Sequence, residues 1–297
     1  MTMQAVRELI DRHTPSAVAL SALAAALDAR ANGVSLDPLL ATRIEELFDV
    51  LGVGRVLDDV GALDAAAVLA ELRNMLVLDY KLQHAHTRST AWDPMDATVV
   101  QIGGEFGHFH GLMLGQKVVP ALGLAERLQA PGAAFLNVGV GSGRLAIALA
   151  QMWPNLRILG VDPCAPAIRV ARDNIERAGL GDRIAIREQG AETLDERDAF
   201  DLAWIPTAFV PERAFAAVCE RTRQALRPGG YVVAAIGNHA AMQPQQGAAF
   251  RLRLALCGGP LWTPAELERQ LRDIGFAEVR ALPTPPGAPV AMFAARK

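Results

Sequence analysis

The sequence contains little cysteine and no surplus of positive charge. Its 297 residues include three cysteines, Cys164, Cys219 and Cys257, which lie far apart and form no CxxC motif. A disulfide framework and a metal site are therefore not expected, and the cysteine usage favours a reducing cytoplasm. The formal net charge is −3 at pH 7. Because proteins that bind nucleic-acid phosphates normally carry a basic surplus, no nucleic-acid partner is expected.

A long apolar run is also missing. Residues 1–12 carry charges throughout and lack the basic and then apolar layout of a signal peptide. The apolar stretch 17–27 is broken by Ser21 and is shorter than the roughly 20 residues that span a bilayer. We expect this stretch to form a core helix, and we expect a soluble protein with no membrane partner.

Apolar side chains are nevertheless abundant, since 51% of the residues are hydrophobic and 21% are charged. Residues 1–130 are rich in Ala and Leu, follow the 3.6-residue period of helices and show almost no strand pattern. Helices are predicted over 64–86, 104–114 and 117–128. We interpret residues 1–130 as an all-helical cap or dimerisation domain, through which the chain could form a homodimer.

Residues 131–297 alternate short apolar runs with helical stretches. Strands are predicted over 134–138, 157–161, 183–187, 200–205, 231–236, 276–282 and 290–295, and helices over 145–152, 165–178 and 212–225. Such alternation is typical of a parallel sheet with helices on both faces. The short, turn-rich connection between the last two strands requires an antiparallel pair. The predicted fold is α/β, a Rossmann-like doubly wound sheet, mostly parallel with one antiparallel strand near the C-terminus.

A glycine-rich turn follows the first predicted strand. The segment 137–143 reads Asn-Val-Gly-Val-Gly-Ser-Gly and precedes an apolar helix. Gly139, Gly141 and Gly143 permit positive φ and let a ligand approach the backbone, and the free N–H groups of a helix start favour an anionic group. Similar turns occur in dinucleotide-binding folds and in ordinary tight turns, so the turn alone does not identify the ligand.

Three further features follow the turn in order. Asp162 ends the next strand, nineteen residues after Gly143, where an acid can accept hydrogen bonds from both hydroxyls of a ribose. The segment 189–192, Gln-Gly-Ala-Glu, follows the third strand, where an adenine ring would be bound. The segment 226–230, Leu-Arg-Pro-Gly-Gly, predicts a helix stop before the fifth strand.

In these features the chain resembles the class I S-adenosylmethionine-dependent methyltransferases over about residues 133–236. The resemblance implies that the three glycines of the turn face the methionine and the ribose, that Asp162 holds the ribose hydroxyls, and that Pro163 and the backbone of Ala191 touch adenine. Residues 204–206 would border the sulfonium and the substrate. The residues implied at the cofactor are Asn137, Gly139, Gly141, Gly143, Asp162, Pro163, Gln189, Gly190, Ala191, Ile205 and Pro206.

The sequence departs from this family at two positions. Asn137 replaces the usual acid before the first glycine, and Gly190 replaces an Asp that often bonds to the adenine amino group. Both changes predict an altered cofactor affinity, and a homologue that no longer binds the cofactor stays an alternative. Nicotinamide binding is the close competitor for this fold. Arg144, in place of a third glycine at GxGxxG spacing, favours the methyltransferase interpretation.

The acceptor is only partly constrained. Residues 204–207 read Trp-Ile-Pro-Thr, which lacks the amide and the tyrosine of the Asn/Asp-Pro-Pro-Tyr-like tetrad found in one subclass of amino-methylating enzymes. This argues against a nucleobase or a glutamine amide and leaves oxygen, carbon, sulfur and some nitrogen acceptors open. Since methyl transfer is an in-line displacement, the protein mostly supplies alignment and sometimes a base.

The candidate bases are histidines. Glu105 and His108 are three residues apart and share a face of a helix, so the carboxylate could orient the imidazole. His108 and His110 could instead line a packing seam. His239 follows the fifth strand at the edge where ligands bind in parallel sheets, or it is a polar loop residue.

The leading hypothesis is a small-molecule methyltransferase with a helical lid, of the kind used in secondary metabolism. One alternative is another reaction of the same cofactor, either aminocarboxypropyl transfer or cyclisation, which releases methylthioadenosine. A second alternative is a non-catalytic module that binds the cofactor or only dimerises.

Overall fold

The computed structural model describes residues 3–54, 57, 60–83, 97–284 and 290–297, and the account below concerns these residues. The chain divides into two compact units, Met1–Leu76 and Val77–Lys297. In the described parts of the chain, no helix combines the length and the apolar character that crossing a membrane requires.

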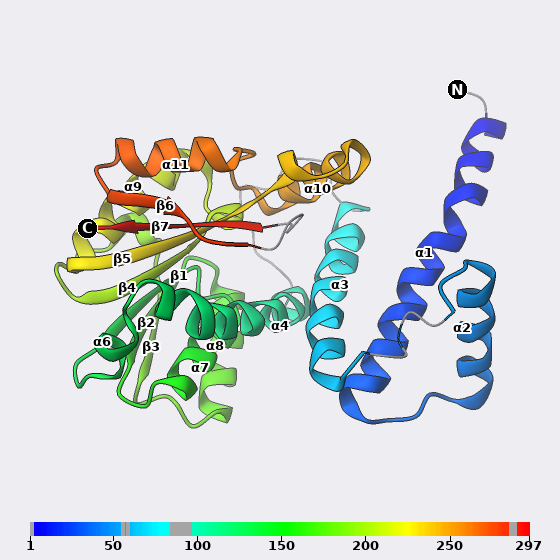
Figure 1. Cartoon of the computed structure of the whole chain (residues 1–297), viewed down its shortest axis with the longest axis horizontal. Helices are drawn as coiled ribbons and strands as arrows, with labels where there is room; N and C mark the ends of the chain where they lie inside the picture. Colours follow the sequence, from blue (N-terminus) through cyan, green and yellow to red (C-terminus); the bar gives the residue numbers. More distant parts are fainter. Residues whose placement is uncertain (1–2, 55–56, 58–59, 84–96, 285–289) are drawn as a thin grey trace. The chain divides into compact units, whose positions relative to one another are not determined.

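The first unit is helical and has a small core. It contains α1 (Met3–Asn32), α2 (Pro38–Val50) and most of α3 (Ala62–Leu82) (Figure 1). Its buried cluster consists of Leu27, Ala65, Leu69 and Leu72. The stretch 17–27, expected to be a core helix, is helical, but within it only Leu27 is buried. The expectation of a core position is therefore wrong for most of the stretch, because the buried cluster of this unit gathers at the C-terminal end of α1.

The second unit is built on a seven-stranded sheet with the strand order β3-β2-β1-β4-β5-β7-β6. The strands are β1 (Ala134–Val138), β2 (Arg157–Asp162), β3 (Ile184–Glu188), β4 (Phe200–Pro206), β5 (Leu226–Gly237), β6 (Ala277–Ala281) and β7 (Val290–Arg296). Only β7 runs against its neighbours β5 and β6, and the other described pairings are parallel. The predicted fold class is confirmed, including the single antiparallel strand near the C-terminus.

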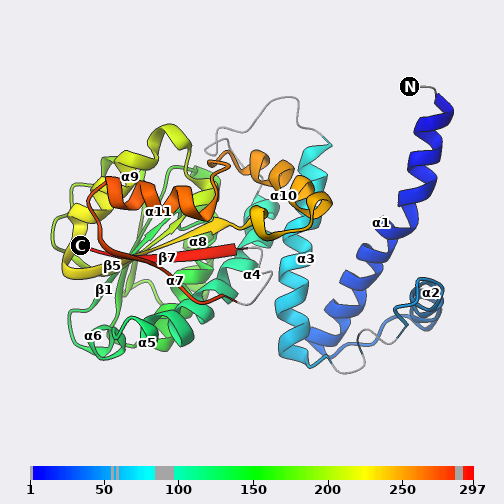
Figure 2. The same ribbon diagram turned by 45° about the horizontal axis from the view of Figure 1, so that its top comes forward.

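Helices cover both faces of the sheet (Figures 1 and 2). They are α4 (Ala97–Met113), α5 (Val119–Ala121), α6 (Ala125–Gln129), α7 (Arg144–Met152), α8 (Ala165–Arg177), α9 (Glu212–Ala225), α10 (Pro244–Cys257) and α11 (Pro264–Asp273). Phe135 and Trp204 face a core shared with α7 and α8, whereas Leu136 and Ile205 face a core shared with α9 and α11. Successive strand residues point to opposite faces, so apolar runs in these strands bury side chains on both faces.

Three glycines of α4 and the turn that follows it bring this helix directly onto its neighbour α7. A Cβ at Gly111 would lie 2.9 Å from the Cβ of Ala148, and one at Gly115 would lie 2.7 Å from the Cε of Met152. A Cβ at Gly104 would lie 2.6 Å from the Cβ of Ser142 in the glycine-rich turn. These spacings of seven and four residues place the glycines on one face of the helix. We call Gly104, Gly111 and Gly115 the glycine seam.

A buried carboxylate ties the start of the sheet to its neighbouring helix. Asp201 is 2% exposed, and its carboxylate accepts hydrogen bonds from the Nε of Arg127 at 2.6 Å, from Arg227 at 2.6 Å and from the backbone N–H of Ala134 at 2.8 Å. Removing one partner of a buried charge is costly, because the remaining charge is left without compensation. This network therefore fixes β1 and β4 relative to α6.

Some helix predictions need correction. The continuous helix expected over 117–128 is wrong: a π-helical turn covers Leu114–Val118, and α5 and α6 are separated by Gly123, whose φ is +68°. Of the helix expected over 64–86, α3 covers all but 83–86; residue 83 forms a turn, and 84–86 lie outside the described residues. The predicted boundary at residue 130 separates helices from strands, because all described strands follow it. The two compact units, however, meet at Leu76 and not at residue 130. The role of residues 1–130 as a cap or dimerisation domain stays a prediction.

Candidate functional site

The glycine-rich turn lies between β1 and α7 and has a backbone that only glycine adopts easily. Gly139, Gly141 and Gly143 have φ values of +65°, +55° and +78°. A Cβ at Gly139 would lie 3.2 Å from the Cγ of Pro206, whereas one at Gly141 would meet almost nothing, its nearest neighbour being a carbonyl oxygen at 4.0 Å. The turn is therefore shaped by backbone geometry, and it leaves room for a ligand at Gly141.

Asp162 connects the end of β2 to this turn. Its Oδ2 accepts a hydrogen bond from the N–H of Gly141 at 3.0 Å, and its Oδ1 accepts one from the N–H of Cys164 at 2.9 Å. Burial raises the pKa of Asp162, and these two backbone hydrogen bonds act in the opposite direction. A carboxylate has about four acceptor positions, so two backbone bonds leave capacity for two ribose hydroxyls.

A side chain of α8 donates a hydrogen bond to the backbone of the glycine-rich turn. The amide of the buried Asn174 donates to the carbonyl oxygen of Ser142 at 2.8 Å and to the side chain of Gln101 on α4 at 3.2 Å. Arg177 donates in turn to Asn174 at 2.7 Å. With Gly104 packed on Ser142, helices α4 and α8 both contact the turn. None of these supports was predicted from the sequence, because they join residues far apart in the chain.

Asn137 stands beside Trp204 in the register of β1 and β4. Asn137 is 1% exposed, and its Nδ2 has no hydrogen-bond partner among the described residues. A buried amide without a partner is costly, so it fits a polar ligand group at this place. Together with the open space at Gly141 and the acceptor capacity of Asp162, it makes the carboxyl edge of β1 and β2 suitable for a nucleoside that carries an amino acid.

The adenine-side segment lies next to Asp162. The N–H of Gln189 donates to the carbonyl oxygen of Asp162 at 3.1 Å, and its side chain donates to the carbonyl oxygen of Thr193 at 3.0 Å. Gly190 and the buried Ala191 follow, at the start of a short 3-10 turn over Ala191–Thr193. The side chain of Gln189 therefore supports this turn, and the backbone of the segment stays close to the ribose side of the site.

The two predicted residues at the end of β4, Ile205 and Pro206, lie in different environments. Ile205 is fully buried in the core shared with α9 and α11, so only its backbone can reach a cofactor. Pro206 packs against the position of Gly139 in the turn. Thr207 follows with 0% exposure, and its Oγ1 has no hydrogen-bond partner in the described part of the chain.

Two histidines, His108 and His110, lie on α4, the helix that contacts the turn at Gly104. The ring of His110 packs edge-on against Phe106, with centroids 4.3 Å apart, and lies 5.7 Å from the ring of Trp204. Burial lowers the pKa of His110 to about 4, against a smaller opposite effect of a backbone hydrogen bond to Phe106. Burial, and then the charge of Arg144, lower the pKa of His108 from 6.5. Both imidazoles are therefore neutral at pH 7.

The other two candidate catalytic residues are His239 and Glu105. His239 is 8% exposed, and its Nε2 lies 3.3 Å from the carbonyl oxygen of Leu261, a contact that favours a structural role. Glu105 lies on α4, and its pairing with His108 stays a prediction. The sequence analysis did not predict that His110 contacts Trp204 and so joins α4 to β4.

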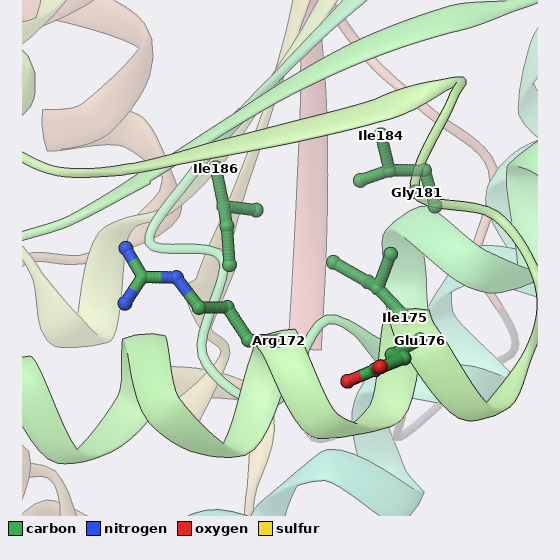
Figure 3. Close-up of a pocket in the computed structure, with 6 residues that line it drawn as sticks. All are labelled: Arg172, Ile175, Glu176, Gly181, Ile184 and Ile186. Atoms are coloured by element: carbon green, nitrogen blue, oxygen red, sulfur yellow. The ribbon is translucent and has the colours of Figure 1, made fainter.

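A shallow hollow lies at the outer edge of the sheet, where side chains from α8 and β3 face one another (Figure 3). It is lined by Arg172, Ile175, Glu176, Gly181, Ile184 and Ile186. None of the predicted site residues lines it. The hollow follows from the position of β3 at the edge of the sheet, and we assign it no role.

Comparison with known proteins supports the interpretation of the glycine-rich turn and the motifs that follow it. The family described as "Methyltransferase domain" matches residues 135–230. A ribosomal protein L11 methyltransferase from Desulfosudis oleivorans is 33% identical over 156 residues, which is 52% of this chain and 47% of the relative. A release factor glutamine methyltransferase from Chlorobaculum tepidum is 36% identical over 109 residues, 33% of this chain and 37% of the relative. The chain thus spans about half or less of the length of these curated relatives.

Solved structures share the fold over the whole chain. A candidate O-methyltransferase from Nostoc punctiforme has a TM-score of 0.64 and 19% identity, with 100% of both chains covered. Human N-acetylserotonin methyltransferase, solved with its cofactor, has a TM-score of 0.64 and 16% identity, covering 100% of this chain and 98% of its own. The glycine-rich turn, the strand order and the domain match agree: residues 135–230 match a methyltransferase domain, and the sheet that contains them has the fold of the solved methyltransferases.

Proposed function

We propose that this protein transfers the methyl group of S-adenosylmethionine to a small-molecule acceptor. The observation that carries the proposal is the arrangement around the glycine-rich turn. There the carboxylate of Asp162 is bonded to the backbone of Gly141 and keeps acceptor capacity, while the buried amide of Asn137 lacks a partner. Two neutral imidazoles lie on α4, the helix that packs against the turn at Gly104.

The cofactor would be held by the turn and by the ends of β2 and β3. In this proposal the backbone of Gly139–Gly143 contacts the amino-acid part, Asp162 accepts from the ribose hydroxyls, and Pro163 and the backbone of Ala191 contact adenine. Gln189 and Gly190 continue the adenine side, and Ile205 and Pro206 border the sulfonium. When bound, S-adenosylmethionine supplies a methyl group on a good leaving group, so the protein mainly aligns the acceptor.

The acceptor would lie on the side of α4 and β4. We infer that His108 is the base, because its lowered pKa keeps its imidazole neutral and able to take a proton from a hydroxyl at pH 7. Glu105 would orient the imidazole of His108. Phe106, His110 and Trp204 would then shape an apolar wall beside the acceptor, since their rings already pack together.

Two features support a small-molecule acceptor over a protein. The solved structures that match the whole chain include proteins described as O-methyltransferases, whereas the protein-methylating relatives match 52% and 33% of the chain. Residues 204–207 also lack the tetrad associated with glutamine amides. A role in secondary metabolism is consistent with such an acceptor.

Product analysis tests this function. The full chain would be incubated with S-adenosylmethionine and a panel of phenols, carboxylic acids, amines and thiols. Formation of S-adenosylhomocysteine that depends on an acceptor supports methyl transfer. Release of methylthioadenosine would instead indicate aminocarboxypropyl transfer or cyclisation, and tight binding without turnover over the panel would indicate a non-catalytic module.

We also infer that the first unit mediates a homodimer. Helix α1 exposes large apolar side chains, among them Leu9, Ile10 and Val18, with exposed fractions of 54%, 56% and 50%. Several such side chains along one helix are typical of a protein interface. Light scattering of the full chain would report the mass, and Leu9→Ser with Ile10→Ser should lower it to that of a monomer. Glu8→Ser, also on the exposed part of α1, is the matched control.

A further inference from the structure

The N-terminal half of α4 rests on the segments that form the cofactor side of the site. Val100 is 5% exposed and packs against Cys164 and Ala167 at the start of α8. Gly104 lies directly on the glycine-rich turn, because a Cβ there would lie 2.6 Å from the Cβ of Ser142. The position of α4 therefore depends on the same loops that we propose to hold the cofactor.

Asn174 joins three elements of the fold through one side chain. It is 5% exposed, and its amide nitrogen donates to the carbonyl oxygen of Ser142 at 2.8 Å and to the Oε1 of Gln101 on α4 at 3.2 Å. Its Oδ1 accepts a hydrogen bond from Arg177 at 2.7 Å. Because a buried amide is costly to leave unpaired, a shift of the Ser142 carbonyl requires Asn174, and Gln101 with it, to follow.

Ser142 lies where a ligand would act on the turn. It follows Gly141, the position at which the turn leaves room for a ligand. The carboxylate of Asp162 bonds to the N–H of Gly141 and also to the N–H of Cys164, on which Val100 packs. A ligand held by the turn and by Asp162 therefore acts on both supports of α4. The same helix carries Phe106, His108 and His110 one to two turns further along.

We propose that Asn174 is a positioning residue that couples the glycine-rich turn to α4, so that cofactor bound at the turn fixes the helix of the proposed acceptor side. This inference rests on the proposed function, because it requires that the turn binds S-adenosylmethionine or its product. The ligand acts by binding more tightly to the arrangement of the turn in which Ser142, Asn174 and Gln101 are bonded together.

Hydrogen–deuterium exchange of the full chain, with and without S-adenosylhomocysteine, tests this coupling without any measurement of turnover. In the wild type, the ligand should slow exchange about tenfold both in residues 137–147 and in α4. Gln101→Leu removes the acceptor on α4 and leaves the hydrogen bond from Asn174 to Ser142 in place. The ligand should still protect the turn, with an affinity within about threefold of the wild type by calorimetry. Its added protection of α4 should fall at least about threefold, and the contacts of Val100 and Gly104 account for the remainder.

A second variant separates the two hydrogen bonds in the other direction. In Asn174→Asp the carboxylate still accepts from Arg177, and the amide of Gln101 can turn to donate to it. Helix α4 then stays tied to α8, whereas the carbonyl of Ser142 loses its donor. Exchange in α4 should stay slow and no longer respond to the ligand. Gln151→Leu makes the matched change at an exposed position of α7 and should leave every ligand-dependent difference as in the wild type.

The outcomes separate this inference from the proposed function. If the wild-type protein does not bind S-adenosylhomocysteine, the proposed function itself fails. If it binds and α4 is not protected, or is protected equally in Gln101→Leu, the coupling is wrong and cofactor binding stands. Faster exchange of α4 in both variants, by the same factor with and without the ligand, would mean that Asn174 only stabilises the packing of α4 on α8.

Discussion

The two sides of the site are held by different interactions. On the cofactor side, backbone groups are fixed by hydrogen bonds, as between Gly141 and Asp162. On the side proposed for the acceptor, the ring of His110 packs edge-on against Phe106 and lies 5.7 Å from the ring of Trp204. Hydrogen bonds fix the position of the groups they join, whereas ring packing sets the shape of a wall.

This difference teaches that binding and turnover can be separated by substitution. A change on the cofactor side should alter cofactor affinity, and a change on α4 should alter the handling of the acceptor.

The largest effect is expected from His108→Ala. If His108 removes the proton of the acceptor, kcat should fall by about a hundredfold or more, with little change in the affinity for S-adenosylhomocysteine. The wild-type rate should also fall as the pH drops through the pKa of His108, and this limb of the profile should disappear in the variant. Gly107→Ala, at a neighbouring position that faces open space, is the control. An unchanged kcat and pH profile would make His108 a packing residue.

Asp162→Ala should act on binding instead. The ribose hydroxyls lose their acceptor and Gly141 loses its hydrogen bond, so the affinity for S-adenosylhomocysteine should fall about a hundredfold. Calorimetry measures this directly. Asp173→Ala, an exposed acid on α8, should have no effect. Equal affinities of Asp162→Ala and wild type would contradict the proposal that this edge of the sheet binds the ribose of the cofactor.

Within the glycine seam, a single methyl group should destabilise the fold. Gly111→Ala places a Cβ 2.9 Å from Ala148 and should lower the free energy of unfolding by about 2 kcal/mol, as overpacking does. Gly107→Ala, in the same helix, meets no atom within 4 Å and should raise it by roughly 0.5 kcal/mol. Urea denaturation of the two variants compares them. Two equal shifts would contradict the close packing of α4 on α7.

The smallest effect concerns His110 and pH. Its pKa of about 4 lies below the unfolded value of 6.5, so the unfolded chain binds the proton first as the pH falls. Stability from this group is complete above pH 6.5 and declines as the pH falls toward 4. His110→Phe keeps a ring beside Phe106 and Trp204 and should flatten the pH dependence of the melting temperature over this range. The same slope in both proteins would assign the dependence to other groups.

The sheet could be predicted from the sequence because its signals are local. Apolar runs marked the strands within a few residues, and the glycine-rich turn with Asp162 marked the carboxyl edge. The helix expected over 117–128 was wrong because Gly123 breaks it, and a 3.6-residue period does not reveal such a break.

Other parts of the site depend on contacts between distant residues. The meeting of His110 with Trp204 joins α4 to β4, and the hydrogen bond from Asn174 to Ser142 joins α8 to the turn. Neither follows from periodicity.

The glycine seam also bears on how the acceptor range of this enzyme can change over evolution. One face of α4 and of the π-helical turn after it is packed against α7, since Gly111 and Gly115 leave no space for a side chain there. Phe106 and His110 are not part of that seam, and their rings pack on each other instead, with His110 beside Trp204. Under the proposed function, a new acceptor would be accommodated by joint exchanges among Phe106, His110 and Trp204, while the glycine seam keeps α4 in place on α7.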